Sequence, residues 1–156
     1  MELELALVRA AHVLGVVLWI GGVAFVTTVL LPAVFRDYPP SARLAAFHRF
    51  ERRFAWQARV SVLITGASGL WLAHRYQLWD RFADPASWWL AAMGLVWLVF
   101  AAMLFVLEPL VLPRVLARLR NPAKAFRAVL VLHWFLLLFS LVTIGGAVAG
   151  AHGLSI

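Results

Sequence analysis

The sequence predicts an all-α integral membrane protein built as a four-helix bundle, and three observations support this. Hydrophobic residues make up 64% of the 156 positions, well above the proportion of about one half in soluble domains. The charged residues are gathered between apolar runs, each near the ~20 residues needed to cross a ~30 Å hydrocarbon core. None of these runs alternates between apolar and polar residues with a period of two, as a barrel strand does. In lipid, every backbone N–H and C=O group must form its hydrogen bond within the protein. Helices are therefore expected.

Four spans follow in order along a single domain, residues 1–156. The first, residues 5–34, is interrupted only by Arg9 and His12. The second, residues 54–79, is most apolar between Val60 and His74. The third and fourth are expected at residues 88–112 and 125–151.

Basic residues predict the orientation of this bundle. The segment between the first two spans and the segment between the last two hold eleven of the fourteen Lys and Arg residues: Arg36, Arg43, Arg49, Arg52, Arg53, Arg59, Arg114, Arg118, Arg120, Lys124 and Arg127. Both segments lie on the same side of the bundle, so the positive-inside rule places them in the cytoplasm of a bacterial cell. The protein is then expected in the inner membrane, with both termini on its periplasmic side. Because topology accounts for the positive charge, no nucleic-acid partner is expected.

The stretch "SARLAAFHRFERRFAWQAR", residues 41–59, has an amphipathic pattern. Leu44, Phe47, Phe50 and Phe54 recur at three- and four-residue steps between basic residues. This pattern predicts a helix that lies on the cytoplasmic membrane surface and runs into the second span.

Ionisable groups inside spans are costly and usually face the bundle interior, so each is a candidate functional residue. His12 lies about 10 Å below the outer surface at 1.5 Å per residue, and Gly15, Trp19 and Gly22 share its helix face. His74, His152 and Met93 are expected at a similar depth on the other helices. The predicted outer site therefore contains three imidazoles and a thioether: His12, His74, His152 and Met93.

Three interpretations of this set remain open. Haem b is held by His/His or His/Met pairs on facing helices, with small residues such as Gly15 and Gly22 making room for the macrocycle. Copper(I) also favours imidazole and thioether ligands. Alternatively, His12 is a core histidine bonded to a carbonyl or hydroxyl, and the other imidazoles lie at the wet interface. The chain has no cysteine, which excludes disulfides, thiolate metal sites and c-type haem attachment.

A second polar cluster is expected nearer the cytoplasm, formed by Arg59, Glu108 and His133. An unpaired charge in lipid costs several kcal/mol, so a structural ion pair between Arg59 and Glu108 is expected. The alternative is a proton- or propionate-binding site that includes His133. The small-residue stretches "TGASG" (residues 65–69) and "TIGGAVAG" (residues 143–150) are typical of close helix packing.

The first-span motif "HVLGVVLWIGG", residues 12–22, resembles that of the copper-resistance D family of bacterial inner-membrane proteins. The four-helix layout also resembles the HemJ type of protoporphyrinogen oxidase, whose basic entry to the second helix is similar to Glu51, Arg52 and Arg53 here. The resemblance implies a membrane protein that handles copper or haem, with His12 as a ligand.

Our hypothesis from the sequence is a haem b protein in which His12 and a second side chain bind the iron. Among the candidates for the second ligand, His74 is preferred. It would act in electron transfer or membrane redox chemistry, exchanging electrons with a quinone or a partner subunit, as a monomer or an oligomer. Catalytic residues are not identified. A copper transport or homeostasis protein and a structural or assembly subunit without a cofactor are the two alternatives.

Overall fold

The computed structural model describes residues 2–111, 114 and 121–153, apart from the side chain of Arg53. The expected end of the third span at Leu112 and the basic residues Arg118 and Arg120 lie outside the described residues. Throughout the described part, the regular secondary structure is helical. The all-α expectation is confirmed at this level.

The first expected span is a nearly unbroken helical stretch of 36 residues. It consists of α1 (Glu2–Phe25), the π-helical turn η1 (Val26–Leu30) and α2 (Leu31–Asp37). The π turn ends two residues before Pro32, which lacks the N–H that a regular α-helix would use there. Thr27 and Thr28 add side-chain bonds of 2.7 Å to the carbonyls four residues earlier.

The second helix, α3 (Arg43–Arg75), has 33 residues and includes the expected amphipathic segment. That segment is not a separate surface helix, because it continues without a break into the rest of α3. Leu44 and Phe47 are buried, and Phe47 packs in a core cluster with α2 and α6. Phe50 remains exposed. The apolar positions that suggested contact with lipid are therefore largely used for packing within the protein.

The remaining chain forms two further long helical stretches. Two short 3₁₀ turns, η2 (Trp79–Phe82) and η3 (Pro85–Ser87), lead into α4 (Trp88–Ala102), which continues as the π-helical η4 (Met103–Val111). Pro109 lies inside η4. The last helix is α6 (Pro122–Ala151), and the side chain of Asn121 caps it by accepting a bond of 3.1 Å from the Lys124 N–H.

In the described part of the chain, three helical stretches are long and apolar enough to cross a membrane: Glu2–Asp37, Pro85–Val111 and Pro122–Ala151. They correspond to the first, third and fourth expected spans. α3 is not among them, since its second half also holds polar and small residues such as Arg59, Ser61 and Thr65. Many large apolar side chains on these three stretches face outward, including Val131 and Phe135, which are 66% and 64% exposed. Exposed apolar surface of this extent suggests a protein embedded in a membrane.

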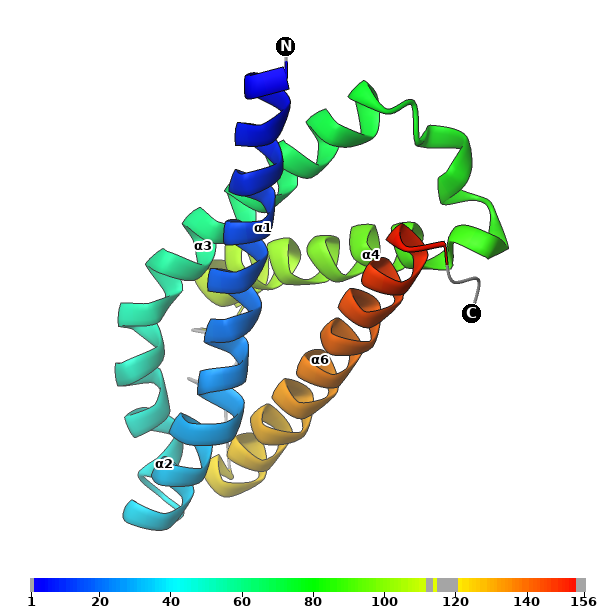
Figure 1. Cartoon of the computed structure of the whole chain (residues 1–156). Coiled ribbons are helices and arrows are strands. Elements are labelled where there is room, and N and C mark those ends of the chain that lie inside the picture. The colour runs from blue at the N-terminus through cyan, green and yellow to red at the C-terminus, as the bar shows by residue number, and fades with distance from the viewer. Residues whose placement is uncertain (1, 112–113, 115–120, 154–156) are drawn as a thin grey trace.

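The helices do not all run alongside one another. α1 packs along α3, and α6 packs against α4 and α3. Figure 1 shows α4 running across the other helices at a wide angle, while α3 curves away from α1 toward the 3₁₀ turns. The main core cluster, which includes Trp19, Val62, Phe100 and Leu136, lies where these elements cross. The divergence of α3 and α4 beyond this core leaves room for a cavity.

Candidate functional site

Two cavities lie on either side of Trp19, which lines both. The large cavity has a volume of about 520 Å³ and is bounded by α1, α3, α4, α6 and the loop with η2. The small cavity has a volume of about 60 Å³ and is bounded by α1, η1, α3, α4, η4 and α6. The large cavity lies within the range of roughly 300–1,000 Å³ that is typical of small-molecule and cofactor sites.

His12 lies in the wall of the large cavity in a fixed orientation. Its Nδ1 is 3.1 Å from the carbonyl oxygen of Thr65 and 3.1 Å from the hydroxyl of Ser68. A carbonyl only accepts, so Nδ1 carries the proton and Nε2 keeps its lone pair. Among the described residues, none forms a hydrogen bond with Nε2. A histidine held through one ring nitrogen in this way has the other nitrogen available to bind a metal.

Glycines of α3 allow two aromatic rings to approach its backbone closely. A Cβ at Gly69 would lie 3.0 Å from Cε1 of His12, and a Cβ at Gly66 would overlap the indole of Trp97. Trp97 donates its Nε1–H to the carbonyl of Val62 at 2.9 Å. The "TGASG" stretch therefore serves close packing, as expected, and one of the groups it accommodates is the imidazole of His12.

Two buried polar atoms beside the large cavity lack a hydrogen-bond partner among the described residues. They are Oγ1 of Thr65 and Nε1 of Trp19, and Trp19 is only 3% exposed. Buried polar groups are nearly always satisfied by protein, water or ligand. Thr65 lines the large cavity, so a bound molecule or water there would provide its missing partner, whereas Trp19 also lines the small cavity.

The rim of the large cavity is positively charged. Arg9 donates to the hydroxyl of Tyr76 and lies over its ring at 5.2 Å from the centroid. Arg9 is the one Lys, Arg, Asp or Glu among the described residues that line the cavity. The remaining lining is mostly apolar and aromatic, and it includes Met93 of α4. This combination suits an apolar molecule that carries a negative charge at one edge.

The structure brings together only some of the residues expected at the outer site. His12, Met93 and Trp19 line the large cavity, whereas His74 and His152 are exposed and do not line it. The imidazole of His152 is instead 2.8 Å from the carbonyl of Val148 on its own helix.

The two glycines of the first-span motif are used for helix packing. A Cβ at Gly15 would lie 2.5 Å from Oγ1 of Thr65, and a Cβ at Gly22 would overlap the ring of Phe54. They therefore allow α1 to approach α3 closely and do not border an open space.

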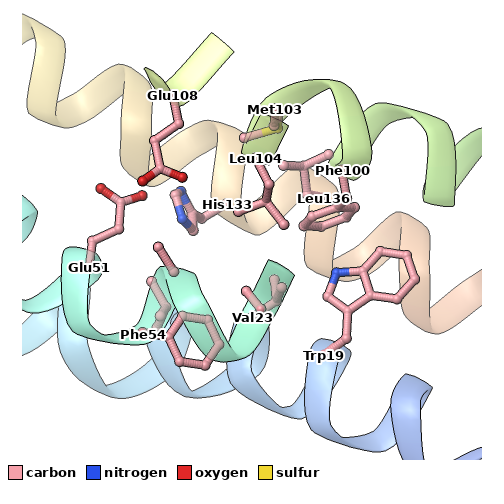
Figure 2. A pocket seen from close by; sticks show the side chains of 13 residues that line it. Trp19, Val23, Glu51, Phe54, Phe100, Met103, Leu104, Glu108, His133 and Leu136 are labelled. Carbon is pink, nitrogen blue, oxygen red and sulfur yellow. The ribbon is translucent and has the colours of Figure 1, made fainter. Parts of the chain in front are cut away.

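The expected ion pair between Arg59 and Glu108 is confirmed. Nη2 of Arg59 is 3.1 Å from Oε1 of Glu108. The Nε–H of Arg59 donates to the carbonyl of Leu104 at 3.2 Å. Glu108 and His133 line the small cavity together with Glu51 of α3. In Figure 2 the carboxylates of Glu51 and Glu108 both point toward the ring of His133.

Glu51 was not expected in this cluster. It lies among the arginines of the amphipathic segment, where a solvated position was the simpler interpretation. The signal that could have identified it is its spacing, because His48 precedes it by one helical turn and their side chains are in contact at 2.8 Å. Thr65 and Gly69, which hold and accommodate His12, were likewise assigned only to packing.

No group of three or more His, Cys, Asp or Glu side chains in the described residues could hold a metal ion. No protein-family model matches the chain, and no curated protein or solved structure is significantly similar to it. The chemistry of the two cavities is therefore the basis for a functional proposal.

Proposed function

We propose that this chain is a membrane haem protein that binds haem b in the large cavity and passes electrons between membrane redox partners. The observation that carries the proposal is the arrangement of His12. Its Nδ1 is fixed by Thr65 and Ser68, and its Nε2 is available beside an apolar cavity of about 520 Å³. When bound, haem b supplies a one-electron centre whose potential is set by its axial ligands and surroundings.

The size and lining of the cavity favour a macrocycle over a single metal ion. A copper ion needs several ligands converging on one point, whereas His12 and Met93 are the imidazole and thioether that this large, mostly apolar space offers. Haem needs one or two axial ligands, flat apolar contacts and a place for its propionates. Arg9 at the rim provides a positive charge for a propionate.

Met93 is a better candidate than His74 for the second axial ligand. Both Met93 and His12 line the large cavity, from α4 and α1. His74 is exposed near the end of α3 and does not line it. His/Met ligation is known for haem and raises its potential relative to His/His ligation. The chain's own contribution is thus to orient His12, to exclude water with aromatic side chains and to place a charge at the rim.

In the membrane, we propose that α3 crosses the bilayer together with the three apolar stretches to give four spans. Two features support this arrangement: α3 packs along α1, and its C-terminal half is largely apolar. The arginine-rich first half of α3 and the start of α6 then lie toward the cytoplasm of a bacterial cell, with both termini periplasmic. A quinone or a partner subunit would supply and remove electrons at the large cavity.

The full chain, expressed with haem precursors and purified in detergent, tests the proposal. We expect a Soret band with about one haem per chain, or its appearance after reconstitution with haemin. His12→Ala should remove the Soret band, because the Nε2 atom proposed to bind the iron is lost. Met93→Leu should retain haem but convert the spectrum to that of a five-coordinate iron.

His74→Ala and His152→Ala are the matched controls and should keep the wild-type spectrum. A colourless wild-type protein after reconstitution would overturn the haem proposal. Parallel metal analysis would then distinguish a copper protein from a subunit without a cofactor. Loss of the band in His74→Ala, with Met93→Leu unchanged, would instead assign the second ligand to His74.

A further inference from the structure

The small cavity has charged and titratable groups at one end and a buried indole at the other. Glu51, Glu108 and His133 come from α3, η4 and α6 and point toward one another (Figure 2). Trp19 lies at the opposite end of the same cavity, beyond the apolar side chains of Phe100 and Leu136. The three polar side chains and Trp19 therefore line one continuous cavity.

Two polar atoms in or beside this space lack partners within the described residues. Nε1 of Trp19 has none, although the side chain is only 3% exposed. Nε2 of His48 also has none; His48 does not line the cavity, but its Nδ1 contacts Glu51 at 2.8 Å. A volume of about 60 Å³ is well above the ~15 Å³ that one water needs. Water in the cavity would give the Trp19 N–H an acceptor.

The charges of the described side chains around this cavity do not balance. On α3 the described groups are His48, Glu51 and Arg59, and η4 contributes Glu108 while α6 contributes His133. With both histidines neutral, two carboxylates face one guanidinium, which leaves one negative charge.

Hydrogen bonds constrain where a proton could be held. Arg59 pairs with Glu108, so Glu51 has His48 as its contact. The Nδ1 of His133 is 2.8 Å from the carbonyl of Val129, which fixes its proton there and leaves Nε2 as an acceptor. One added proton would make the cluster neutral, and both carboxylates and His133 offer it an acceptor atom.

We propose that the small cavity is a proton-binding site, in which Glu51, Glu108 and His133 share one proton with a short chain of waters that ends at the Trp19 N–H. Glu51 is partly exposed, with 25% of its side-chain surface accessible, so the proton enters from bulk water at that end. The proton adds to a carboxylate oxygen or to Nε2 of His133, and no other bond changes. Trp19 donates to the last water and holds the chain in place. This site does not depend on the occupant of the large cavity.

Nuclear magnetic resonance of the full chain in detergent micelles, labelled with ¹⁵N at tryptophan, tests this site directly. The Trp19 indole resonance among the eight tryptophans is identified by its disappearance in Trp19→Phe. We expect a cross-peak between this N–H and water, and a chemical shift that changes with pH in one transition. Glu51→Gln should move that transition by about one pH unit or remove it, because a neighbouring charge is lost.

Glu4→Gln is the matched control. Glu4 lies in the exposed first turn of α1, the helix that carries Trp19, so this change should leave the transition unchanged. Glu51→Gln keeps the Arg59–Glu108 pair, so circular dichroism should show an intact helical fold. Two results would overturn the proposal: a Trp19 N–H without a water cross-peak, or a resonance that does not respond to pH. These measurements need no haem, so a failure here is distinct from a failure of the haem proposal.

Discussion

Replacing Gly69 with alanine tests whether the position of the His12 imidazole controls haem binding, because the change moves this ring without weakening α3. A Cβ at this position would lie 3.0 Å from Cε1 and 3.4 Å from Nδ1 of His12. To reach ordinary contact, the imidazole must retreat by about 0.4 Å. Its Nδ1 is already 3.1 Å from both acceptors, Thr65 and Ser68, so this movement takes the bonds past the usual limit of about 3.2 Å.

The expected result is weaker haem binding in a protein that is at least as stable. Loss of a ligand's orienting hydrogen bond costs about 10–100-fold in metal affinity. Alanine is favoured over glycine inside a helix by about 1 kcal/mol, so the free energy of unfolding should not fall. Haemin titration followed by the Soret band gives the affinity, and thermal unfolding followed by circular dichroism gives the stability.

Gly21→Ala is the matched control, because no atom lies within 4 Å of the Cβ it would add to α1. It gains the same helix propensity without moving His12. Wild-type haem affinity in Gly69→Ala would refute the argument that the Nδ1 bonds orient the ligand. An equal loss in Gly21→Ala would show that the effect is not specific to the large cavity.

Three further substitutions test the packing in the same unfolding assay. Phe47→Ala should lower the free energy of unfolding by about 3–5 kcal/mol, since Phe47 is 1% exposed and the change leaves a cavity; the 64% exposed Phe135 is its control and should change little. Gly22→Ala should cost about 1–3 kcal/mol, because the added methyl group overlaps the ring of Phe54, and an unchanged stability would show that this ring moves freely. Trp97→Phe should cost about 1–3 kcal/mol, because it removes the indole hydrogen bond to the Val62 carbonyl and leaves space where the larger ring packs on Gly66, and a stability equal to wild type would contradict that role.

The positions of the apolar helices follow closely from the sequence, because length and hydrophobicity are properties of a single segment. The expected spans at residues 88–112 and 125–151 correspond to Pro85–Val111 and Pro122–Ala151 within the described part. The segment at residues 41–59 was assigned differently, since its pattern fits both a lipid surface and a protein core. Only the neighbouring elements decide between them, and here α2 and α6 cover Phe47.

The composition of the site was less predictable, because it depends on how the helices are rotated against one another. The sequence identifies which residues share a face of α1, and Gly15 and Trp19 are indeed buried on one face with His12 half-buried beside them. It does not show which residues of α3 that face meets. The partners of His12 proved to be a backbone carbonyl and a serine hydroxyl, the kind of contact expected of a core histidine, and both lie in the "TGASG" stretch that was assigned to packing.

Among the described residues, Trp19 is the one side chain that lines both cavities. Its indole therefore lies between the cavity in which we propose haem and the cavity in which we propose a proton and waters. If both proposals hold, this bulky, buried ring would keep the waters of the small cavity away from the haem.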